Sequence, residues 1–216
     1  MTRLHLGCGQ RRFDGYINID YPLSEHSVQR TSVADEFHDL TALRYTAGSI
    51  DEVRLHHVFE HFERAKAAAL LASWNSWLRP GGILHVEVPD FGRTARAVLG
   101  RLSSAQARMV GLRHIFGSQE AHWAVHYEGY TRDTLCAFLE RFGMEPMDVK
   151  QERWKDTYNL IVVARKARGL NSEELEAAGR EHLRQYLVDD SDSELDLLEI
   201  WMQDYRNQLA RTLATG

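Results

Sequence analysis

The chain has 216 residues, of which 44% are hydrophobic and 26% charged, and its formal net charge at pH 7 is −5. This composition is ordinary for a globular protein and too apolar for a disordered one. Residues 168–216 contain 5 basic and 11 acidic residues, whereas residues 1–167 contain 21 basic and 20 acidic residues. A nearly neutral body with an acidic tail argues against a broad surface for nucleic acid or an anionic membrane, although a local basic site stays open.

Hydropathy and cysteine content exclude further classes. No stretch approaches the roughly 20 apolar residues of a membrane-spanning helix. The N-terminus, MTRLHLGCG, lacks the features of a signal peptide. With only Cys8 and Cys136, the chain has neither a disulfide framework nor a four-cysteine zinc site. We therefore expect a cytoplasmic protein with no membrane span.

Short apolar segments bounded by turn residues predict strands in the N-terminal part. Residues 4–6 lead directly into Gly7-Cys8-Gly9, and residues 16–20 form a second short strand. The connection between them has room only for a short helix or a loop. Residues 32–37 are a weaker strand candidate, and residues 50–58 alternate well enough to form a strand.

The middle of the chain alternates between helical and extended patterns. Residues 63–78 have helical spacing, and Pro80-Gly81-Gly82 is expected to stop that helix before a strand at 83–88. Residues 92–130 predict one or two helices, then a loop rich in glycine, histidine and aromatic residues. Residues 131–142 predict a helix with Thr131 as N-cap and Gly143 at its C-terminal end. This order favours parallel crossover units in a twisted sheet.

Two further strands and a helical tail complete the chain. Residues 144–151 and 159–166 predict a final strand pair. Beyond Gly169 the pattern is helical, with Asn171 as a cap and Glu174 three residues later. A second helix follows Asp189-Asp190-Ser191. We expect a helical hairpin that docks on the body or on a partner chain.

The Gly7-Cys8-Gly9 turn ends the first predicted strand, where open parallel sheets bind ligands. Glycines there let the main chain approach a ligand closely. The third glycine of a dinucleotide-binding fingerprint would fall at Arg12, and the acidic residue Asp20 follows too early. A nicotinamide or flavin site therefore fits poorly.

The motifs LHLGCG, GYINID, HDL, HHVFEHF and WLRPGGILHVEVPD resemble, in that order, those of the class I S-adenosylmethionine-dependent methyltransferases. The small type 11 domains with an abbreviated first crossover are the most similar, over about residues 3–166. The resemblance implies an α/β fold with a Rossmann-like, mostly parallel twisted sheet of six to seven strands, the last one antiparallel, flanked by helices. The C-terminal helical hairpin is additional. One departure is Arg11, where the family commonly has a third glycine.

The resemblance also implies a domain organisation and a cofactor. Residues 1–167 would form the S-adenosylmethionine-binding domain, within which residues 91–130 would cap the acceptor site. Residues 168–216 would form an acidic helical extension. The cofactor would be S-adenosylmethionine and its product S-adenosylhomocysteine. Because the first predicted strand begins close to Met1, we expect the cap to come from residues 91–130, from the C-terminal helices or from a second subunit.

Residue by residue, the resemblance predicts which positions hold the cofactor. Asp20 would bind both ribose hydroxyls, and Asp39 and Leu40 would meet the adenine. The methionine part and the methyl group would lie against Gly7, Cys8, Gly9 and His56. The residues themselves allow other interpretations, since Asp20 could start a turn, Asp39 could cap the next segment and Cys8 could simply pack.

The implied reaction is an in-line displacement at a sulfonium methyl, for which a protein supplies orientation, exclusion of water and in some cases a base. For a hydroxyl acceptor, histidine is the base best suited to neutral pH. The candidate bases are His57, His61 and His126. The residues expected to contact the acceptor are Glu60, His122, Trp123 and Tyr127. The aromatic residues could equally pack the cap.

His57-Val58-Phe59-Glu60-His61 also matches an inverted zinc-protease motif. That chemistry needs both histidines on one face of a helix. Here the first histidine ends a predicted strand, and Glu60 and His61 are expected to open the following helix. We therefore predict no metal site.

The leading hypothesis is a methyltransferase acting on a small molecule, such as a sugar or another biosynthetic hydroxyl. One alternative is a protein methyltransferase, and another is a non-catalytic cofactor-binding or scaffold protein of the same fold. We expect no nucleic-acid partner. The C-terminal helices could form a homodimer, and we predict that they are structural or oligomeric rather than catalytic.

Overall fold

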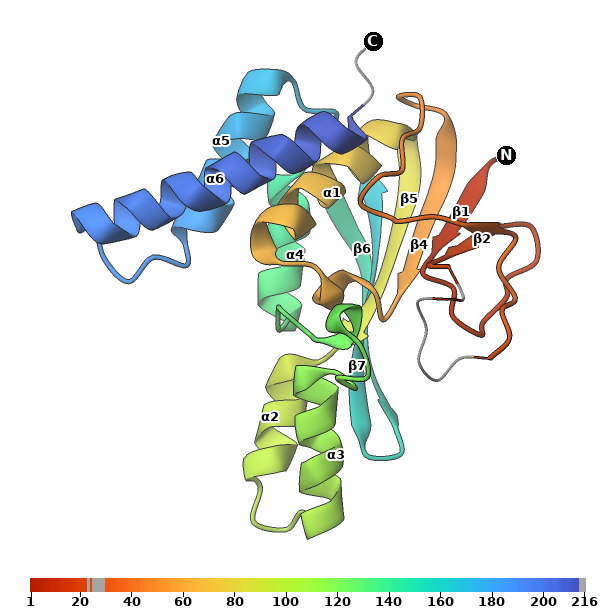
Figure 1. Ribbon diagram of the computed structural model, residues 1–216, viewed down its shortest axis with the longest axis vertical. Helices are drawn as coiled ribbons and strands as arrows, with labels where there is room; N and C mark the ends of the chain where they lie inside the picture. The colour runs from red at the N-terminus through yellow and green to blue at the C-terminus, as the bar shows by residue number, and fades with distance from the viewer. Residues whose placement is uncertain (23, 25–29, 214–216) are drawn as a thin grey trace.

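A computed structural model describes residues 1–22, 24 and 30–213. The described strands form one seven-stranded sheet in the order β3-β2-β1-β4-β5-β7-β6 (Figure 1). Strands β1 to β5 pair in parallel, and β7 runs antiparallel to both β5 and β6. The strands are β1 (Arg3–Leu6), β2 (Ile17–Asp20), β3 (Glu36–Phe37), β4 (Ile50–His56), β5 (Leu78–Pro89), β6 (Met144–Trp154) and β7 (Thr157–Lys166). This confirms the predicted Rossmann-like sheet.

The helices lie between and after these strands. They are α1 (Arg64–Trp77), α2 (Phe91–Leu99), α3 (Ala105–Phe116), α4 (Arg132–Arg141), α5 (Ser172–Arg184) and α6 (Asp192–Thr212). The predicted caps are present, because Thr131 accepts a hydrogen bond from the N–H of Thr134, and Asn171 accepts one from that of Glu174. No described helix is both long and apolar enough to cross a bilayer.

Four local expectations need correction. The strand expected at 32–37 is reduced to Glu36–Phe37. The first long helix ends at Trp77, before Pro80, and the Pro80-Gly81-Gly82 segment lies inside β5. The strand expected to run to Val58 ends at His56. Glu60 and His61 do not open α1, since they belong to a separate 3₁₀ turn, η2 (Phe59–His61), and α1 begins only at Arg64.

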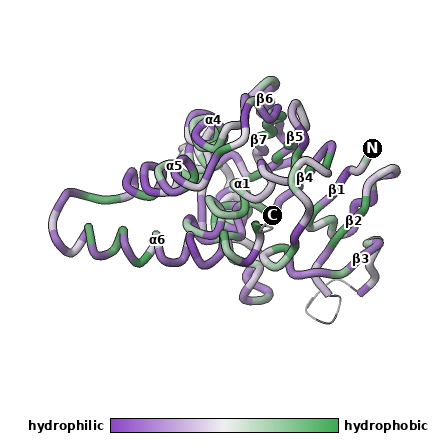
Figure 2. The backbone as a smooth tube through the Cα atoms, turned by 90° about the horizontal axis from the view of Figure 1, so that it is seen from above, coloured by the Kyte–Doolittle hydropathy of each residue, from purple (hydrophilic) through white to green (hydrophobic). Residues whose placement is uncertain are grey.

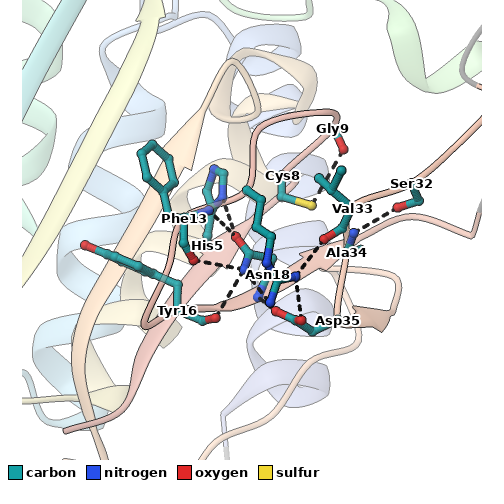
Figure 3. Close-up of polar contacts among 11 residues, drawn as sticks. His5, Cys8, Gly9, Phe13, Tyr16, Asn18, Ser32, Val33, Ala34 and Asp35 are labelled. Carbon is teal, nitrogen blue, oxygen red and sulfur yellow. Dashed lines mark hydrogen bonds and ion pairs between the residues drawn. The ribbon is translucent and has the colours of Figure 1, made fainter.

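A buried asparagine shapes the connection between β1 and β2, which contains no α-helix. The side-chain amide of Asn18 donates to the carbonyls of Phe13 and Tyr16, both at 3.1 Å, and to Asp35 at 2.9 Å. Its Oδ1 accepts from the N–H of Phe13 at 2.9 Å (Figure 3). Hydrogen bonds from the main chain and side chain of Asn18, and one from Arg12, lower the pKa of Asp35 to about 2. Asn18 therefore ties the loop into one network in place of a helix.

Helix α1 explains why the C-terminal helices belong to the same core. Eleven of its residues are buried, so it is apolar on nearly all sides. Figure 2 shows α1 between the strands and α6. Leu198, Met202 and Tyr205 of α6 are almost completely buried and join the hydrophobic cluster of the sheet. The Ser73 and Thr212 hydroxyls are 2.6 Å apart in the same interface. The inner face of α6 therefore covers α1.

Candidate functional site

A cavity of about 370 Å³ lies at the carboxyl ends of the parallel strands. Gly7 follows β1, Asp20 ends β2 and His57 follows β4, and all three line the cavity. Because β1 lies between β2 and β4, the strand order reverses at this point. Open α/β sheets bind their ligands at such a reversal. The volume is in the range of small-molecule sites.

The cavity collects many, but not all, of the residues predicted from the sequence. Those that line it are Gly7, Asp20, Asp39, Leu40, His57, His61, His122, Trp123 and Tyr127. Five predicted residues are not part of the lining in the described structure, namely Cys8, Gly9, His56, Glu60 and His126. Sequence reasoning did not single out Tyr21, Thr41, Val58, Phe62, Glu63 and Lys66, which also line it.

Gly7 is required by close packing as well as by backbone conformation. Its φ is +66°, and a Cβ atom there would lie 2.3 Å from Cγ2 of Val58. Gly9 has a φ of +55°, but a Cβ would meet nothing within 4 Å. Cys8 is buried between them, and burial raises the pKa of its thiol to about 12. A thiol this inert matches the packing interpretation of Cys8.

Two aspartates mark the side of the cavity formed by β2 and the segment after β3. Asp20 is 5% exposed, and its Oδ1 accepts a hydrogen bond from the N–H of Tyr21 at 2.8 Å. Asp39 accepts from both the N–H and the hydroxyl of Thr41, at 2.8 and 2.7 Å, so it caps its own turn. Helix α6 supports this turn, because the side chain of Gln208 donates to the carbonyl of Thr41 at 2.7 Å.

A cluster of histidines and glutamates lies after β4. The Nδ1 atom of His57 is 3.2 Å from Oε1 of Glu60, and its Nε2 is 3.7 Å from Oε1 of Glu87. The Nε2 of His56 is 3.2 Å from the same Glu87 oxygen. His57 has a φ of +54°, a left-handed conformation that is costly outside glycine. Its N–H donates to the carbonyl of Glu87 at 2.9 Å, which helps to hold that conformation.

Burial and charge oppose each other in this cluster. Burial acts to lower the pKa of His57, but the hydrogen bond to Glu60 and the charges of Glu60 and Glu87 outweigh it, and the net pKa is raised. Burial likewise acts to raise the pKa of Glu60, yet the bond from His57 and the nearby histidines hold it well below its usual range. The pair is therefore stabilised in its charged form.

His61 and His126 fasten the aromatic loop to the η2 turn. The Nδ1 of His61 lies 3.0 Å from the carbonyl of Val125, and the two histidine rings meet edge to face with centroids 4.6 Å apart. The N–H of Tyr127 donates to the carbonyl of Glu60 at 2.9 Å. An Nδ1–H donating to Val125 leaves the Nε2 of His61 as a proton acceptor. His126 Nε2 is 3.9 Å from Glu60, and burial lowers the pKa of His126.

The zinc-protease motif does not assemble as such. His57 and Val58 follow the end of β4, and Phe59, Glu60 and His61 form a 3₁₀ turn, so the motif does not lie on one α-helix. Among the described residues, His57 groups with His56 and Glu87, whereas His61 groups with Glu60 and His126. Each group holds three possible ligand atoms within 4.8 Å of one another. The expected absence of a metal stays a prediction, which metal analysis of the purified protein tests.

Comparison with known proteins places this geometry in a wider group. No protein-family model and no curated protein matches the sequence. Among solved structures, a chain of the complex between the Haloferax volcanii Trm112 methyltransferase activator and a methyltransferase aligns with a TM-score of 0.54 and 13% identity, over 79% of this chain and 83% of that one. The Burkholderia thailandensis 1,6-didemethyltoxoflavin-N1-methyltransferase, with bound S-adenosylhomocysteine, aligns with a TM-score of 0.51 and 16% identity, over 77% of this chain and 71% of that one.

A third neighbour is an S-adenosylmethionine-dependent methyltransferase from Mesorhizobium loti, with a TM-score of 0.50 and 18% identity, over 76% of this chain and 90% of that one. At such low identity these likenesses concern the fold. Together with the strand order and the cavity at its reversal, they show that the chain has the class I S-adenosylmethionine-dependent methyltransferase fold.

Proposed function

We propose that this protein is a methyltransferase that uses S-adenosylmethionine to methylate a small-molecule acceptor. The observation that carries the proposal is the composition of the cavity. One part of the chain brings Gly7, Asp20, Asp39 and Leu40 to it, and a second part brings histidines and aromatic residues. The first set suits a nucleoside with an amino-acid tail, and the second suits an acceptor that must be oriented and deprotonated.

The residues of the first set match the chemistry of the cofactor. The Asp20 carboxylate, at the end of β2, offers paired acceptor oxygens for two ribose hydroxyls. Leu40 supplies an apolar surface for the adenine, beside the Asp39 turn. Gly7, which has a positive φ and no side chain, lets the main chain lie directly beside the cavity. When bound, S-adenosylmethionine supplies an electrophilic methyl group.

His57 is the proposed base for a hydroxyl acceptor. Glu60 accepts a hydrogen bond from the Nδ1–H of His57, so that Nε2 is the ring nitrogen that would take the proton. Glu60 is 1% exposed and does not line the cavity, so we propose that it positions His57 rather than contacting the acceptor. His61 is the second candidate, since its Nδ1 is held by Val125 and it also lines the cavity.

His122, Trp123 and Tyr127 are proposed to bind the acceptor. All three line the cavity, and the η2 turn holds their loop in place through His61 and Glu60. Aromatic faces with hydrogen-bonding tips suit a sugar or a planar small molecule. His126 packs behind this loop, with its Nδ1 3.1 Å from the carbonyl of His114, so we propose a supporting role for it.

Two measurements test the proposal. Calorimetric titration with S-adenosylmethionine and with S-adenosylhomocysteine should give saturable binding at one site. Absence of binding would support the scaffold alternative and reject the proposal. The protein is then incubated with methyl-labelled cofactor and a fractionated lysate, and label should enter the low-molecular-mass fraction. Label found only in protein would instead favour a protein methyltransferase.

A further inference from the structure

The hairpin of α2 and α3 is a projecting element that the cavity does not use. Figure 1 shows it extending away from the body, beside the turn between β6 and β7. Of the predicted cap at residues 91–130, the described cavity lining includes only His122, Trp123 and Tyr127, all after α3. The hairpin therefore needs an explanation of its own.

The charge of this hairpin differs from that of the rest of the chain. Residues 91–118 contain five arginines and no aspartate or glutamate, although the whole chain is acidic. Arg96, Arg101, Arg108 and Arg113 are exposed. No ion pair joins these four to a carboxylate in the described part of the chain. The hairpin thus presents a local positive surface that the net charge of the chain conceals.

Exposed apolar side chains lie among these arginines. Leu99 at the end of α2 is 82% exposed, Leu102 in the turn is fully exposed and Met109 in α3 is 62% exposed. We call residues 96–109, which contain them, the hairpin tip. Trp154, the last residue of β6, is also 64% exposed. Leucine, methionine and tryptophan among arginines are the side chains that proteins place at the boundary between water and lipid.

The exposure is built into the packing of the hairpin. Gly111 of α3 lies so close to Val98 of α2 that a Cβ would meet its Cγ2 at 2.5 Å. The hydroxyl of Ser103 donates to the carbonyl of Ala97 at 2.6 Å, and Ser104 caps α3 by accepting from the N–H of Ala107. Val98 and Gly111 therefore meet in the interface between the helices, whereas Leu99, Leu102 and Met109 remain exposed.

We propose that the hairpin tip docks the protein on the surface of an anionic lipid bilayer. Arginines would bind lipid phosphates and carboxylates, while Leu99, Leu102 and Met109 would enter the interface. A nucleic acid would also attract the arginines, but residues 96–109 contain no aromatic side chain on which a base could stack, and the exposed Trp154 belongs to β6 rather than to the hairpin. The exposed leucines favour a lipid surface over a nucleic acid. This inference does not depend on the proposed methyl transfer.

The test is sedimentation of the full chain with vesicles of phosphatidylcholine alone or with 30% phosphatidylglycerol. We expect binding only to the anionic vesicles, and its loss in high salt. The variant R96E/R101E should lower the partition coefficient by at least about 25-fold, because each basic residue contributes about fivefold to binding at an anionic surface. The variant L99S/L102S should lower it by at least about tenfold, because two apolar side chains no longer enter the interface.

Matched controls keep the test decisive. R132E changes an exposed arginine on α4, and V188S changes an 88% exposed residue between α5 and α6, so both should bind as the parent does. Circular dichroism confirms that each variant is folded. No sedimentation with anionic vesicles, equal binding by the tip variants, or tighter binding to a 20-nucleotide RNA than to vesicles would each overturn the proposal.

Discussion

The Nδ1 atom of His57 lies 3.2 Å from Oε1 of Glu60, a carboxylate that is 1% exposed. The pair joins the residue after β4 to the η2 turn, so a buried carboxylate contacts a histidine that lines the cavity. Because breaking such a pair leaves one buried charge uncompensated, its effect on stability depends on pH.

The substitution E60Q keeps the shape of the side chain but removes its charge. We expect it to lower the free energy of unfolding by about 1–3 kcal/mol. The depressed pKa of Glu60 contributes stability above its unfolded value of 4.5, which is lost as pH falls toward the folded value. The raised pKa of His57 contributes stability below 6.5, which is lost as pH rises through the folded value. The difference from the parent should therefore be largest between pH 4.5 and 6.5 in denaturant titrations.

E63Q is the control, because Glu63 is half exposed and, within the described part of the chain, forms an ion pair with Lys66 alone. E63Q should change the free energy of unfolding little, and its difference from the parent should show no maximum between pH 4.5 and 6.5. In activity, E60Q should move the acidic limb of the kcat profile to lower pH, because His57 loses the charge that raises its pKa. An unmoved limb would argue against His57 as the base.

The substitution D20N tests the ribose contact. We expect the Kd for S-adenosylmethionine to rise about 5- to 150-fold, as expected for losing charged hydrogen bonds worth 1–3 kcal/mol. Asparagine keeps the oxygen that accepts from Tyr21, so the fold should survive. D148N, on the exposed edge strand β6, should bind normally. Equal calorimetric affinities for parent and D20N would remove Asp20 from the site.

G7A and G9A separate close packing from backbone conformation. Both residues have positive φ, so each alanine should cost about 1 kcal/mol in strain. Only at Gly7 does a new Cβ clash with Val58, so G7A should cost about 1–3 kcal/mol more. G7A should also weaken cofactor binding more strongly than G9A. Equal melting temperatures for the two variants would contradict the close approach at Gly7.

Gly179 tests the packing of α5 on α6. An alanine Cβ would lie 2.7 Å from the ring of Tyr205, whose hydroxyl is held by the carbonyl of Leu175 at 2.8 Å. G179A should therefore destabilise the protein by about 1–2 kcal/mol, although alanine is the better helix former. G169A meets nothing within 4 Å and should be close to neutral. Stabilisation by G179A would show that the hairpin packs differently.

Deletion of residues 170–216 tests whether the C-terminal helices are structural. It would uncover α1 and remove Leu198, Met202 and Tyr205 from the core. We expect loss of cooperative unfolding. M202A, a milder change, should cost about 2–5 kcal/mol. A deletion variant with the parent's melting temperature and oligomeric state would contradict a structural role.

Several features could be predicted because they follow from local chemistry. Glycine turns after a short strand, the Thr131 and Asn171 caps and the strand-helix alternation all depend on residues close in sequence. The cavity residues Gly7, Asp20 and His57 can also be predicted, Gly7 from its glycine turn after a strand, and Asp20 and His57 from the motifs that carry the resemblance. Asn18 was missed, although a buried asparagine inside a strand is an unusual choice that signals a network.

Other features depended on contacts between distant segments. The spacing of apolar residues in 63–78 predicts a helix, but it does not indicate that α6 covers the outer face of this helix, because α6 lies far along the chain. Phe62, Glu63 and Lys66 line the cavity only because η2 separates from α1 and turns the chain there. No sequence pattern marks such a turn.

The charge distribution shows the same division. The sequence by itself determined the class of fold, the ligand-binding end of the sheet and the acidic character of the tail, because periodicity, glycine turns and composition are local properties. Only the tertiary structure decided which histidines share a carboxylate, and that the hairpin of α2 and α3, whose sequence contains five arginines, extends away from the body. Both depend on how separate segments pack, and a sum of charges along the chain cannot contain that information.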